Sequence, residues 1–324
     1  MTTWLVTGGA GYIGAHVVRA LQQQGLTPVV LDNLSSGLAR FVPDDVSFTE
    51  ADILDTDAVA GVLREHDCAG VIHVAGYKYA GVSVQRPLHT YAQNVTGTAS
   101  VLTAMADVGV QNLVFSSSAA VYGTPSSDLV TEDSPNAPES PYGESKLIGE
   151  WLINDQARAT PGFHGVSLRY FNVVGSATDE VYDASPHNLF PLVIEALLEG
   201  RTPRINGVDY PTADGTCVRD YVHVGDLANS HVAAARALEA GRELRPAYNL
   251  GSGEGLSVRQ IMDAMARVTG IDFTPLIGER RPGDPARIVA DGKPAAADLD
   301  WKMSYSVDEM VASAWSARKA SGPA

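Results

Sequence analysis

Apolar residues follow two alternating patterns along the first half of the chain. Short continuous runs typical of buried strands occupy residues 3–7, 28–31, 46–49, 70–74, 112–116 and 166–171. Between them, apolar residues recur at helical spacing, most clearly in segments 55–65, 87–109 and 142–158. This alternation predicts a parallel sheet with helices on both faces, which is the doubly wound α/β, or Rossmann, class.

The pattern changes after about residue 175. Predicted strands become sparse, and helices such as 188–199 and 226–240 alternate with loops rich in proline and glycine. We therefore expect a Rossmann domain at residues 1–175 and a smaller, mixed α/β domain at residues 176–324. The apolar run at residues 247–250 is expected to return to the main sheet as a further strand.

Small or polar residues follow most of the predicted strands. In chain order they are a glycine turn after residue 7, then Asp32, Asp52, Ala75 with Gly76, Ser118 and Asn172. The carboxyl ends of parallel strands share one edge of a sheet, and ligands of such sheets bind in the crevice outside that edge. The sequence therefore predicts a binding site along this edge.

The glycine turn predicts a dinucleotide site. Gly8, Gly11 and Gly14 lie between the first strand and a helix, where the backbone can approach a pyrophosphate and the helix N-terminus offers N–H groups. Asp32 ends the next strand and can accept both ribose hydroxyls of an adenosine, while it would repel a 2′-phosphate. The sequence thus favours NAD over NADP. A simple turn at Asp32 and Asn33 is compatible with this interpretation.

Tyr142 and Lys146 form a candidate catalytic pair. They are four residues apart at the start of a predicted helix, so both side chains can point into the same space. A tyrosine with a pKa of about 10 is a poor base at neutral pH, and a neighbouring cation lowers that pKa. The alternative is a helix with a buried tyrosine and a solvated lysine. The polar residues gathered at the same sheet edge favour the catalytic interpretation.

Charge and composition narrow the class of ligand. The net charge of -15 argues against nucleic acid or an anionic membrane as the main partner. The two cysteines form no CxxC motif and the histidines show no metal-ligand spacing, so we expect neither a disulfide framework nor a metal site. With no basic leader and no long apolar run, a cytoplasmic location is expected.

Seven segments resemble the extended short-chain dehydrogenase/reductase family and, within it, the UDP-glucose 4-epimerases. The segments are VTGGAGYIG (6–14), LDNL (31–34), FSSSAAVYG (115–123), SPYGESK (140–146), LRYFN (168–172), DYPTADGTCVRDYVHV (209–224) and RRPGD (280–284). The first five are shared by many nucleotide-sugar enzymes, and the last two are more specific to this epimerase. The resemblance implies an isomerase that interconverts UDP-glucose and UDP-galactose through a transient 4-keto sugar, using tightly bound NAD.

The resemblance also implies roles for individual residues. Tyr142 would take the proton of the sugar 4-hydroxyl, directly or through Ser118, while Lys146 holds the nicotinamide ribose and keeps the phenol acidic. Related sugar dehydratases carry a carboxylate after the first serine of the triplet, which is absent after Ser116 here, so the base needed for elimination is missing.

The implied binding residues fall into two sets. The cofactor set adds Tyr12, Ile13, Asn33, Asp52, Ile53, Val74, Ala75, Gly76, Lys78, Asn94 and Phe171 to the glycines, Asp32 and the catalytic pair. The substrate set adds Asn172, Asn188, Arg219, Arg281, Asp284 and Ile288 to Ser118 and Tyr142. Ion pairs of Arg219 with Asp220 and of Arg281 with Asp284 are alternatives that the sequence leaves open.

Three departures from the family's pattern leave the sugar preference open. Residues 77–83 carry Val82 where a carboxylate is usual, and segment 176–187 is shorter than usual. Ile288 stands where the family has a tyrosine in enzymes restricted to glucose and galactose, and a small residue in those that accept N-acetyl sugars. UDP-N-acetylhexosamines, UDP-pentoses or an NAD-dependent oxidoreductase reaction on a nucleotide sugar are therefore alternatives.

Helices 87–109 and 142–158 carry apolar stripes. The first stripe includes Leu102 and Met105, and the second includes Leu147 and Trp151. The resemblance implies that such helices pair across a two-fold axis into a four-helix bundle, so we expect a homodimer. Burial of the stripes against the chain's own sheet is the alternative.

Overall fold

The computed structural model describes residues 2–127, 129–280 and 285–322. Its main sheet has seven strands, all parallel, in the order β12-β7-β5-β4-β1-β2-β3. The strands are β1 (Thr3–Thr7), β2 (Thr27–Asp32), β3 (Ser47–Glu50), β4 (Gly70–His73), β5 (Asn112–Ser118), β7 (His164–Tyr170) and β12 (Ala247–Leu250). The doubly wound α/β class is confirmed, and the strand order reverses direction at β1, where such sheets bind ligands.

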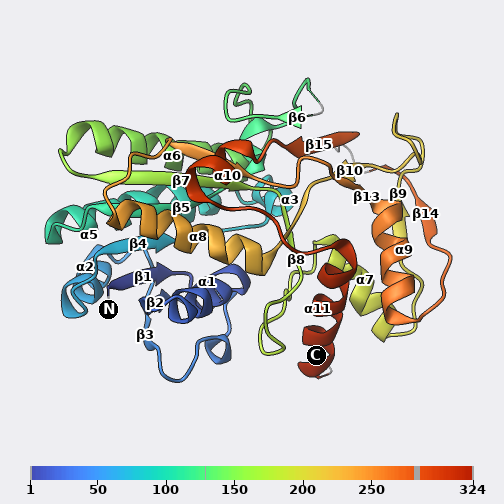
Figure 1. Ribbon diagram of the computed structural model, residues 1–324, viewed down its shortest axis with the longest axis horizontal. Helices are drawn as coiled ribbons and strands as arrows, with labels where there is room; N and C mark the ends of the chain where they lie inside the picture. Colours follow the sequence, from blue (N-terminus) through green and yellow to red (C-terminus); the bar gives the residue numbers. More distant parts are fainter. Residues whose placement is uncertain (1, 128, 281–284, 323–324) are drawn as a thin grey trace.

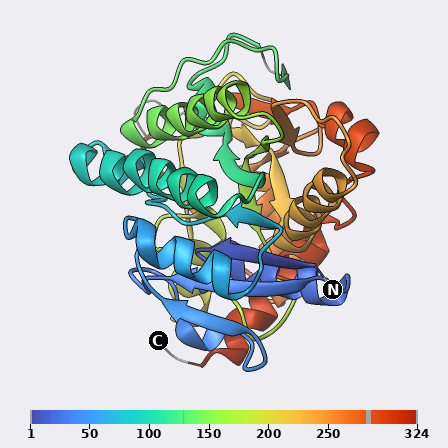
Figure 2. The ribbon, with the colours of Figure 1, turned by 90° about the vertical axis from the view of Figure 1, so that its left-hand side faces the viewer.

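Alternation along the strands sends apolar side chains to both faces of this sheet. In β1, Trp4 and Val6 pack in one buried cluster and Leu5 in another. Helices α1 (Tyr12–Gln23) and α8 (Val224–Glu239) cover the first face, and α2 (Thr56–Glu65), α5 (Gly97–Val108) and α6 (Pro141–Ala159) cover the second. Figure 2 shows α5 and α6 on one side of the sheet and α8 on the other.

Helix α8 belongs to the second half of the sequence but covers a face of the main sheet, most of whose strands come from the first half. It follows residue 175, yet it packs beside α1 against the main sheet (Figure 1). Leu227, Val232 and Leu238 on its apolar face join the cluster of Val17 and Leu21. The sequence pattern predicts the helix but carries no signal of the surface that it covers.

The helix expected at residues 87–109 is divided. It consists of α4 (Pro87–Tyr91), a π-helical turn (Ala92–Thr96) and α5. The extra residue of a π-turn changes the direction of the following side chains, and such turns are frequent at functional sites. Here the turn contains the buried Asn94.

The second region is a mixed α/β layer around a further sheet, in the order β13-β10-β15-β6. Its strands are β13 (Leu256–Ser257), β10 (Val218–Arg219), β15 (Arg287–Ala290) and β6 (Leu129–Val130), with pairs β8 (Asn172–Val174) with β11 (Tyr221–His223) and β9 (Arg204–Asn206) with β14 (Leu276–Gly278) beside it. These strands have two to four residues, too short to show a sequence pattern.

Helices α7 (Leu189–Leu198), α9 (Val258–Thr269) and α11 (Val307–Ala320) belong to this second region. Helix α10 (Lys293–Leu299) packs instead against β12 of the main sheet and against α8. Ile194, Ile261, Met265 and Met310 form the centre of the cluster that holds α7, α9 and α11 together. The remaining short elements are α3 (Ala80–Ser83) and the 3₁₀ turns Ala39–Phe41 and Ala119–Tyr122.

Candidate active site

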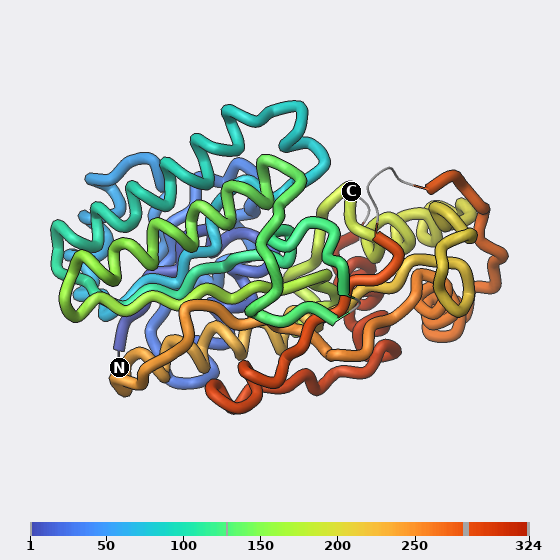
Figure 3. The backbone as a smooth tube through the Cα atoms, turned by 90° about the horizontal axis from the view of Figure 1, so that it is seen from above, coloured from blue at the N-terminus to red at the C-terminus, as the bar shows by residue number. Residues whose placement is uncertain are grey.

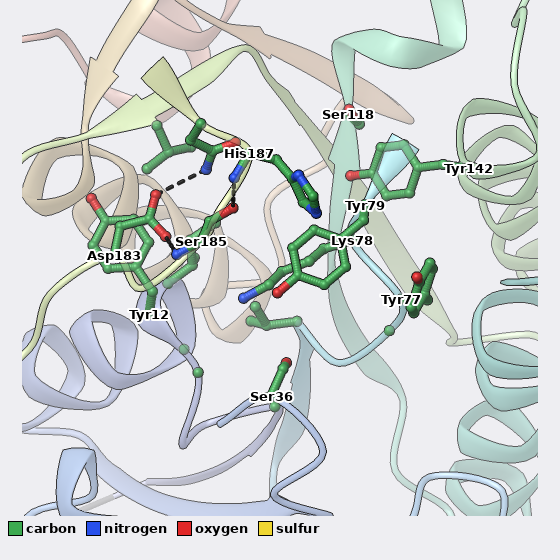
Figure 4. A pocket seen from close by; sticks show the side chains of 18 of the residues that line it. Tyr12, Ser36, Tyr77, Lys78, Tyr79, Ser118, Tyr142, Asp183, Ser185 and His187 are labelled. Atoms are coloured by element: carbon green, nitrogen blue, oxygen red, sulfur yellow. Dashed lines mark hydrogen bonds between the residues drawn. The ribbon is translucent and has the colours of Figure 1, made fainter. Parts of the chain in front are cut away.

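A cavity of about 970 Å³ lies along the carboxyl ends of the main-sheet strands, a volume at the upper end of ligand sites. Figure 4 shows part of its wall. The sequence-predicted residues that line it are Gly8, Gly11, Tyr12, Ile13, Gly14, Asp32, Asn33, Asp52, Ile53, Val74, Ala75, Gly76, Lys78, Ser118, Tyr142, Lys146, Phe171, Asn172, Asn188 and Arg219. Residues from both regions of the chain thus meet around one space.

At one end of the cavity, the glycine turn forms a cradle of bare backbone. Gly8 has a φ of +74°, and a Cβ on it would lie 2.7 Å from the backbone nitrogen of Ala75. A Cβ on Gly14 would lie 2.1 Å from the carbonyl oxygen of Gly8. Helix α1 begins at Tyr12 without a side-chain cap, so its first N–H groups face the ligand space. This cradle fits a pyrophosphate.

The carboxylate of Asp32 closes the next turn. Its oxygens accept the N–H groups of Ala10 at 3.0 Å and Leu34 at 2.8 Å. Burial raises its pKa, and these hydrogen bonds together with Lys78 oppose the rise. Asn33 donates to Asp52 at 2.8 Å, which joins the ends of β2 and β3. The arrangement fits an adenosine, with acceptors at its ribose.

At the other end, Tyr142 enters from the first turn of α6. Ser140 caps this helix by accepting the N–H of Gly143 at 3.2 Å, and Pro141 occupies the first helical position. The N–H of Tyr142 donates to the hydroxyl of Ser83 at 3.1 Å. The phenol is thereby aimed at the cavity, beside Ser118 (Figure 4).

The structure does not give Tyr142 the lowered pKa expected from Lys146. Burial raises the pKa of Tyr142, and only a hydrogen bond with Ser118 opposes the rise. Lys146 donates to the carbonyl of Ser116 at 2.9 Å, and its ammonium lies 6.0 Å from the centre of the Tyr142 ring. Burial also lowers the pKa of Lys146 to about 8, against the attraction of Glu150. A further positive charge is needed to make the phenol a base.

Asn94 lies behind the cavity wall rather than on it. Its carbonyl oxygen accepts the N–H of Tyr77 at 2.6 Å, and its amide donates to the carbonyl of Tyr77 at 3.0 Å and to Ser145 at 2.8 Å. It therefore fastens the loop after β4 to the start of α6. The structure places it in a positioning role.

The two asparagines predicted to bind the substrate donate hydrogen bonds from their side-chain amides to neighbouring residues. Asn172 donates to the carbonyl of Asp220 at 3.0 Å, and Asn188 donates to Asp183 at 2.9 Å. The guanidinium of Arg219 donates to the carbonyl of Val218 at 2.8 Å and lines the cavity. The carboxylate of Asp220 accepts hydrogen bonds from Ser252, Gly253 and Ala290.

Two predicted substrate residues, Arg281 and Asp284, lie outside the described residues. Ile288 is buried in a cluster with Val121, Leu147 and Phe171, and it is not among the described residues that line the cavity. Its side chain packs beneath the wall because β15 pairs with β10 and buries it.

Several lining residues were not predicted. Those with polar side chains include Ser35, Ser36, Tyr77, Tyr79, Arg86, His89, Gln93, Tyr170, Asp183, Ser185, His187, Arg204, Asn206 and Tyr221. Tyr77 and Tyr79 belong to a segment that already departed from the family's pattern, which was a usable signal. Loop residues such as Asp183 and His187 gave none, since only the folded chain brings them to the cavity. Among the described residues, no cluster of His, Cys, Asp and Glu has an arrangement suited to a metal ion.

No helix within the described parts of the chain is both long and apolar enough to cross a membrane.

Comparisons with known proteins agree with this geometry. The model of the NAD dependent epimerase/dehydratase family matches residues 4–251. UDP-glucose 4-epimerase of Erwinia amylovora is 41% identical over 325 residues, which cover 96% of each chain.

Two solved structures share the fold. One is UDP-glucose-4-epimerase from Stenotrophomonas maltophila with bound NAD and formylated UDP-arabinopyranose, at a TM-score of 0.94, 37% identity and 99% coverage of both chains. The other is the UDP-Glc/GlcNAc 4-epimerase from Campylobacter jejuni, at a TM-score of 0.86 and 34% identity, covering 98% of this chain and 99% of that one.

Proposed function

Because this chain belongs to the NAD dependent epimerase/dehydratase family, we propose that it interconverts UDP-glucose and UDP-galactose with bound NAD. One observation carries the proposal. Tyr142, Ser118 and Lys146 lie at one end of a cavity whose other end is the glycine cradle and Asp32. A proton acceptor and a dinucleotide site therefore share one enclosed space.

The chain's own groups fit the dinucleotide. The backbone of Gly8 to Gly14 and the start of α1 would hold the pyrophosphate, and Asp32 would accept the adenosine ribose hydroxyls. Asp52 and Ile53 would border the adenine. Bound in this way, oxidised NAD supplies reversible hydride transfer at the sugar carbon and a positive charge beside the phenol.

Tyr142 would exchange the proton of the sugar 4-hydroxyl, with Ser118 relaying it. Because burial raises the pKa of the phenol, the base form has to be favoured by nearby positive charge. Lys146, fixed to the carbonyl of Ser116 with its ammonium 6.0 Å from the centre of the phenol ring, is one such cation, and the further positive charge would come from bound oxidised NAD. Arg219 and Asn188 would hold the diphosphate side of the substrate.

The two ligands are proposed to bind mainly to two successive parts of the chain. We propose that residues 1–175 hold the dinucleotide and residues 176–324 hold the nucleotide sugar, with the strand at 247–250 serving the first part. We also propose that the protein works in the cytoplasm, as its composition leads us to expect.

The direct test uses the purified protein without added cofactor. UDP-galactose should be converted to UDP-glucose, detected by nucleotide-sugar chromatography, with no net NADH. Accumulation of NADH in proportion to substrate would point instead to an oxidoreductase. Conversion of UDP-N-acetylgalactosamine or a UDP-pentose alone would move the proposal to those sugars, and no conversion of any of them would refute it.

We further propose that a second copy of the chain covers the outer surface of α4 and α6. Figure 3 shows α5 and α6 side by side along one flank of the molecule. Leu102 and Met105 are buried inside the chain, so part of the predicted stripe packs against its own sheet. Leu88 and Trp151, however, remain 83% and 55% exposed on this flank. Light scattering at micromolar concentration should give the mass of two chains, and a single-chain mass would exclude the homodimer.

A further inference from the structure

The rings of Tyr79 and His187 meet across the cavity. Their centroids are 5.1 Å apart and their planes cross at 78°, which is the favourable edge-to-face arrangement of aromatic rings. Both residues line the cavity, and Figure 4 shows both rings together with Tyr142. We call this pair the aromatic bridge. It joins the loop that follows β4 to the segment that precedes α7, which are the two segments that depart most from the family's pattern.

The aromatic bridge has a fixed position relative to the catalytic phenol. Tyr79 directly precedes α3, and its carbonyl accepts the N–H of Ser83 at 2.8 Å. The hydroxyl of Ser83 in turn accepts the N–H of Tyr142 at 3.1 Å. Two consecutive hydrogen bonds thus connect the backbone of Tyr79 to that of Tyr142, so the ring borders the space into which the phenol points.

Further rings support Tyr79 from behind. The ring of Tyr77 lies 5.6 Å from that of Tyr79, and the ring of His89 lies 5.0 Å from that of Tyr77. The ammonium of Lys78 lies 5.5 Å from the centre of the Tyr79 ring. This side of the bridge is a half-buried row of rings in mutual contact, with Lys78 exposed beside it.

The carboxylate of Asp183 holds the other side of the bridge. It accepts the N–H of Ser185 at 3.0 Å and the amide of Asn188 at 2.9 Å, while the N–H of His187 donates to Ser185 at 3.4 Å (Figure 4). His187 therefore lies between groups whose positions are set by one residue. Its ring faces Tyr79 on one side and solvent on the other.

We propose that Tyr79 and His187 determine which sugars this enzyme turns over, and that they disfavour a bulky 2-acetamido group. The inference rests on the proposed function. A 4-keto sugar that must accept hydride on either face needs clearance as it turns, and the aromatic bridge limits that clearance with two rings. Ile288 is not among the described residues that line the cavity, whereas both rings of the bridge are. Solved structures of this fold are named for both glucose and N-acetylglucosamine, so the preference varies within the fold.

The test compares UDP-galactose with UDP-N-acetylgalactosamine as substrates. The wild type should favour UDP-galactose, and Tyr79→Ala should lower the ratio of the two kcat/KM values by about tenfold. His187→Ala should do the same. Because the rings act as one wall, the double variant should lower the ratio by little more than either single variant. Tyr79→Phe, which keeps the ring, is the matched control and should retain the wild-type ratio.

The outcomes separate the two proposals. If the wild type converts UDP-galactose but the ratio is the same in the alanine variants, the role of the bridge is refuted while the proposed function stands. Equal use of both sugars by the wild type refutes the bridge as well. If no sugar is converted, the proposed function fails. The affinities of the wild type and the variants for the two UDP-sugars, measured by calorimetry, then decide whether the bridge disfavours the 2-acetamido group. His187→Ala, at an exposed position, guards against loss of folding in Tyr79→Ala.

Discussion

The half of the cavity around the glycine turn is made by backbone, whereas the half around His187 and Asn188 is made by side chains on loops. Gly8, Gly14 and Asp32 owe their positions to turns that directly follow the strands of one sheet. Asn188 and His187 owe theirs to Asp183, a side chain on a loop between distant elements. The first half is fixed by local geometry and tolerates little change. The second can vary residue by residue without disturbing the sheet, which suits a site that selects among sugars.

Removal of the phenolic oxygen at the junction of the two halves should give the largest effect. Tyr142→Phe deletes the group proposed to exchange the proton but leaves the packing of the ring unchanged. Turnover of UDP-galactose should fall by about 10³-fold or more, while the NAD content measured after denaturation stays that of the wild type. Ser118→Ala is the informative companion, since a relay that can be bypassed should cost less. Full activity of Tyr142→Phe would remove the phenol from the mechanism.

Adding a methyl group to Gly14, in the half of the cavity made by backbone, should weaken NAD binding nearly as strongly as Tyr142→Phe lowers turnover. A Cβ at Gly14 meets the carbonyl oxygen of Gly8 at 2.1 Å, and backbone cannot move aside as a flexible side chain can. Gly14→Ala should therefore lower the affinity for the dinucleotide by about a hundredfold, measured by fluorescence titration with NADH. Gly61→Ala is the matched control, because this glycine of α2 has no atom within 4 Å of its added Cβ. Retention of NAD by Gly14→Ala would contradict the cradle.

The buried charge of Lys146, which lies where the two halves of the cavity meet, gives a third prediction. Burial lowers its pKa from 10.5 to about 8, so between these values the unfolded chain holds a proton that the folded chain does not. Stability should accordingly rise with pH across this window, and the burial of the ammonium should cost roughly 3 kcal/mol below it. Lys146→Met removes that cost.

The measurement is the difference in unfolding free energy between Lys146→Met and the wild type. We expect the variant to be the more stable protein at pH 7, with an advantage that shrinks as the pH rises from 8 towards 10.5. Taking the difference cancels the other groups that titrate in this range. A constant difference across the window would mean that the ammonium is not desolvated in the folded protein.

The contrast between the halves also explains how far the sequence predicts the site. Asp32 and Gly14 could be assigned because a strand, a turn and a helix follow each other within a few residues, and this order fixes where they lie. His187 could not, because its contact with Tyr79 joins segments that only the fold brings together. The burial of Ile288 was missed for the same reason, since its strand has two neighbours from distant parts of the chain. The pKa of Tyr142 could not be predicted because spacing reveals neither that the phenol is buried, which raises its pKa, nor that Lys146 donates to the carbonyl of Ser116.

Replacement of Asp183 tests the half of the cavity made by side chains and should have the smallest effect on activity. Its carboxylate accepts from Ser185 and Asn188, and Asp183→Ala should release both without touching the sheet. Because the loop then has to be ordered by the substrate, the KM for UDP-galactose should rise by about tenfold while kcat and NAD content change little. Asp179→Ala, on the same segment, controls for the loss of a charge. A fall in kcat or in bound NAD for Asp183→Ala would mean that the two halves of the cavity are built as one unit, and that the sugar side cannot vary independently of the cofactor side.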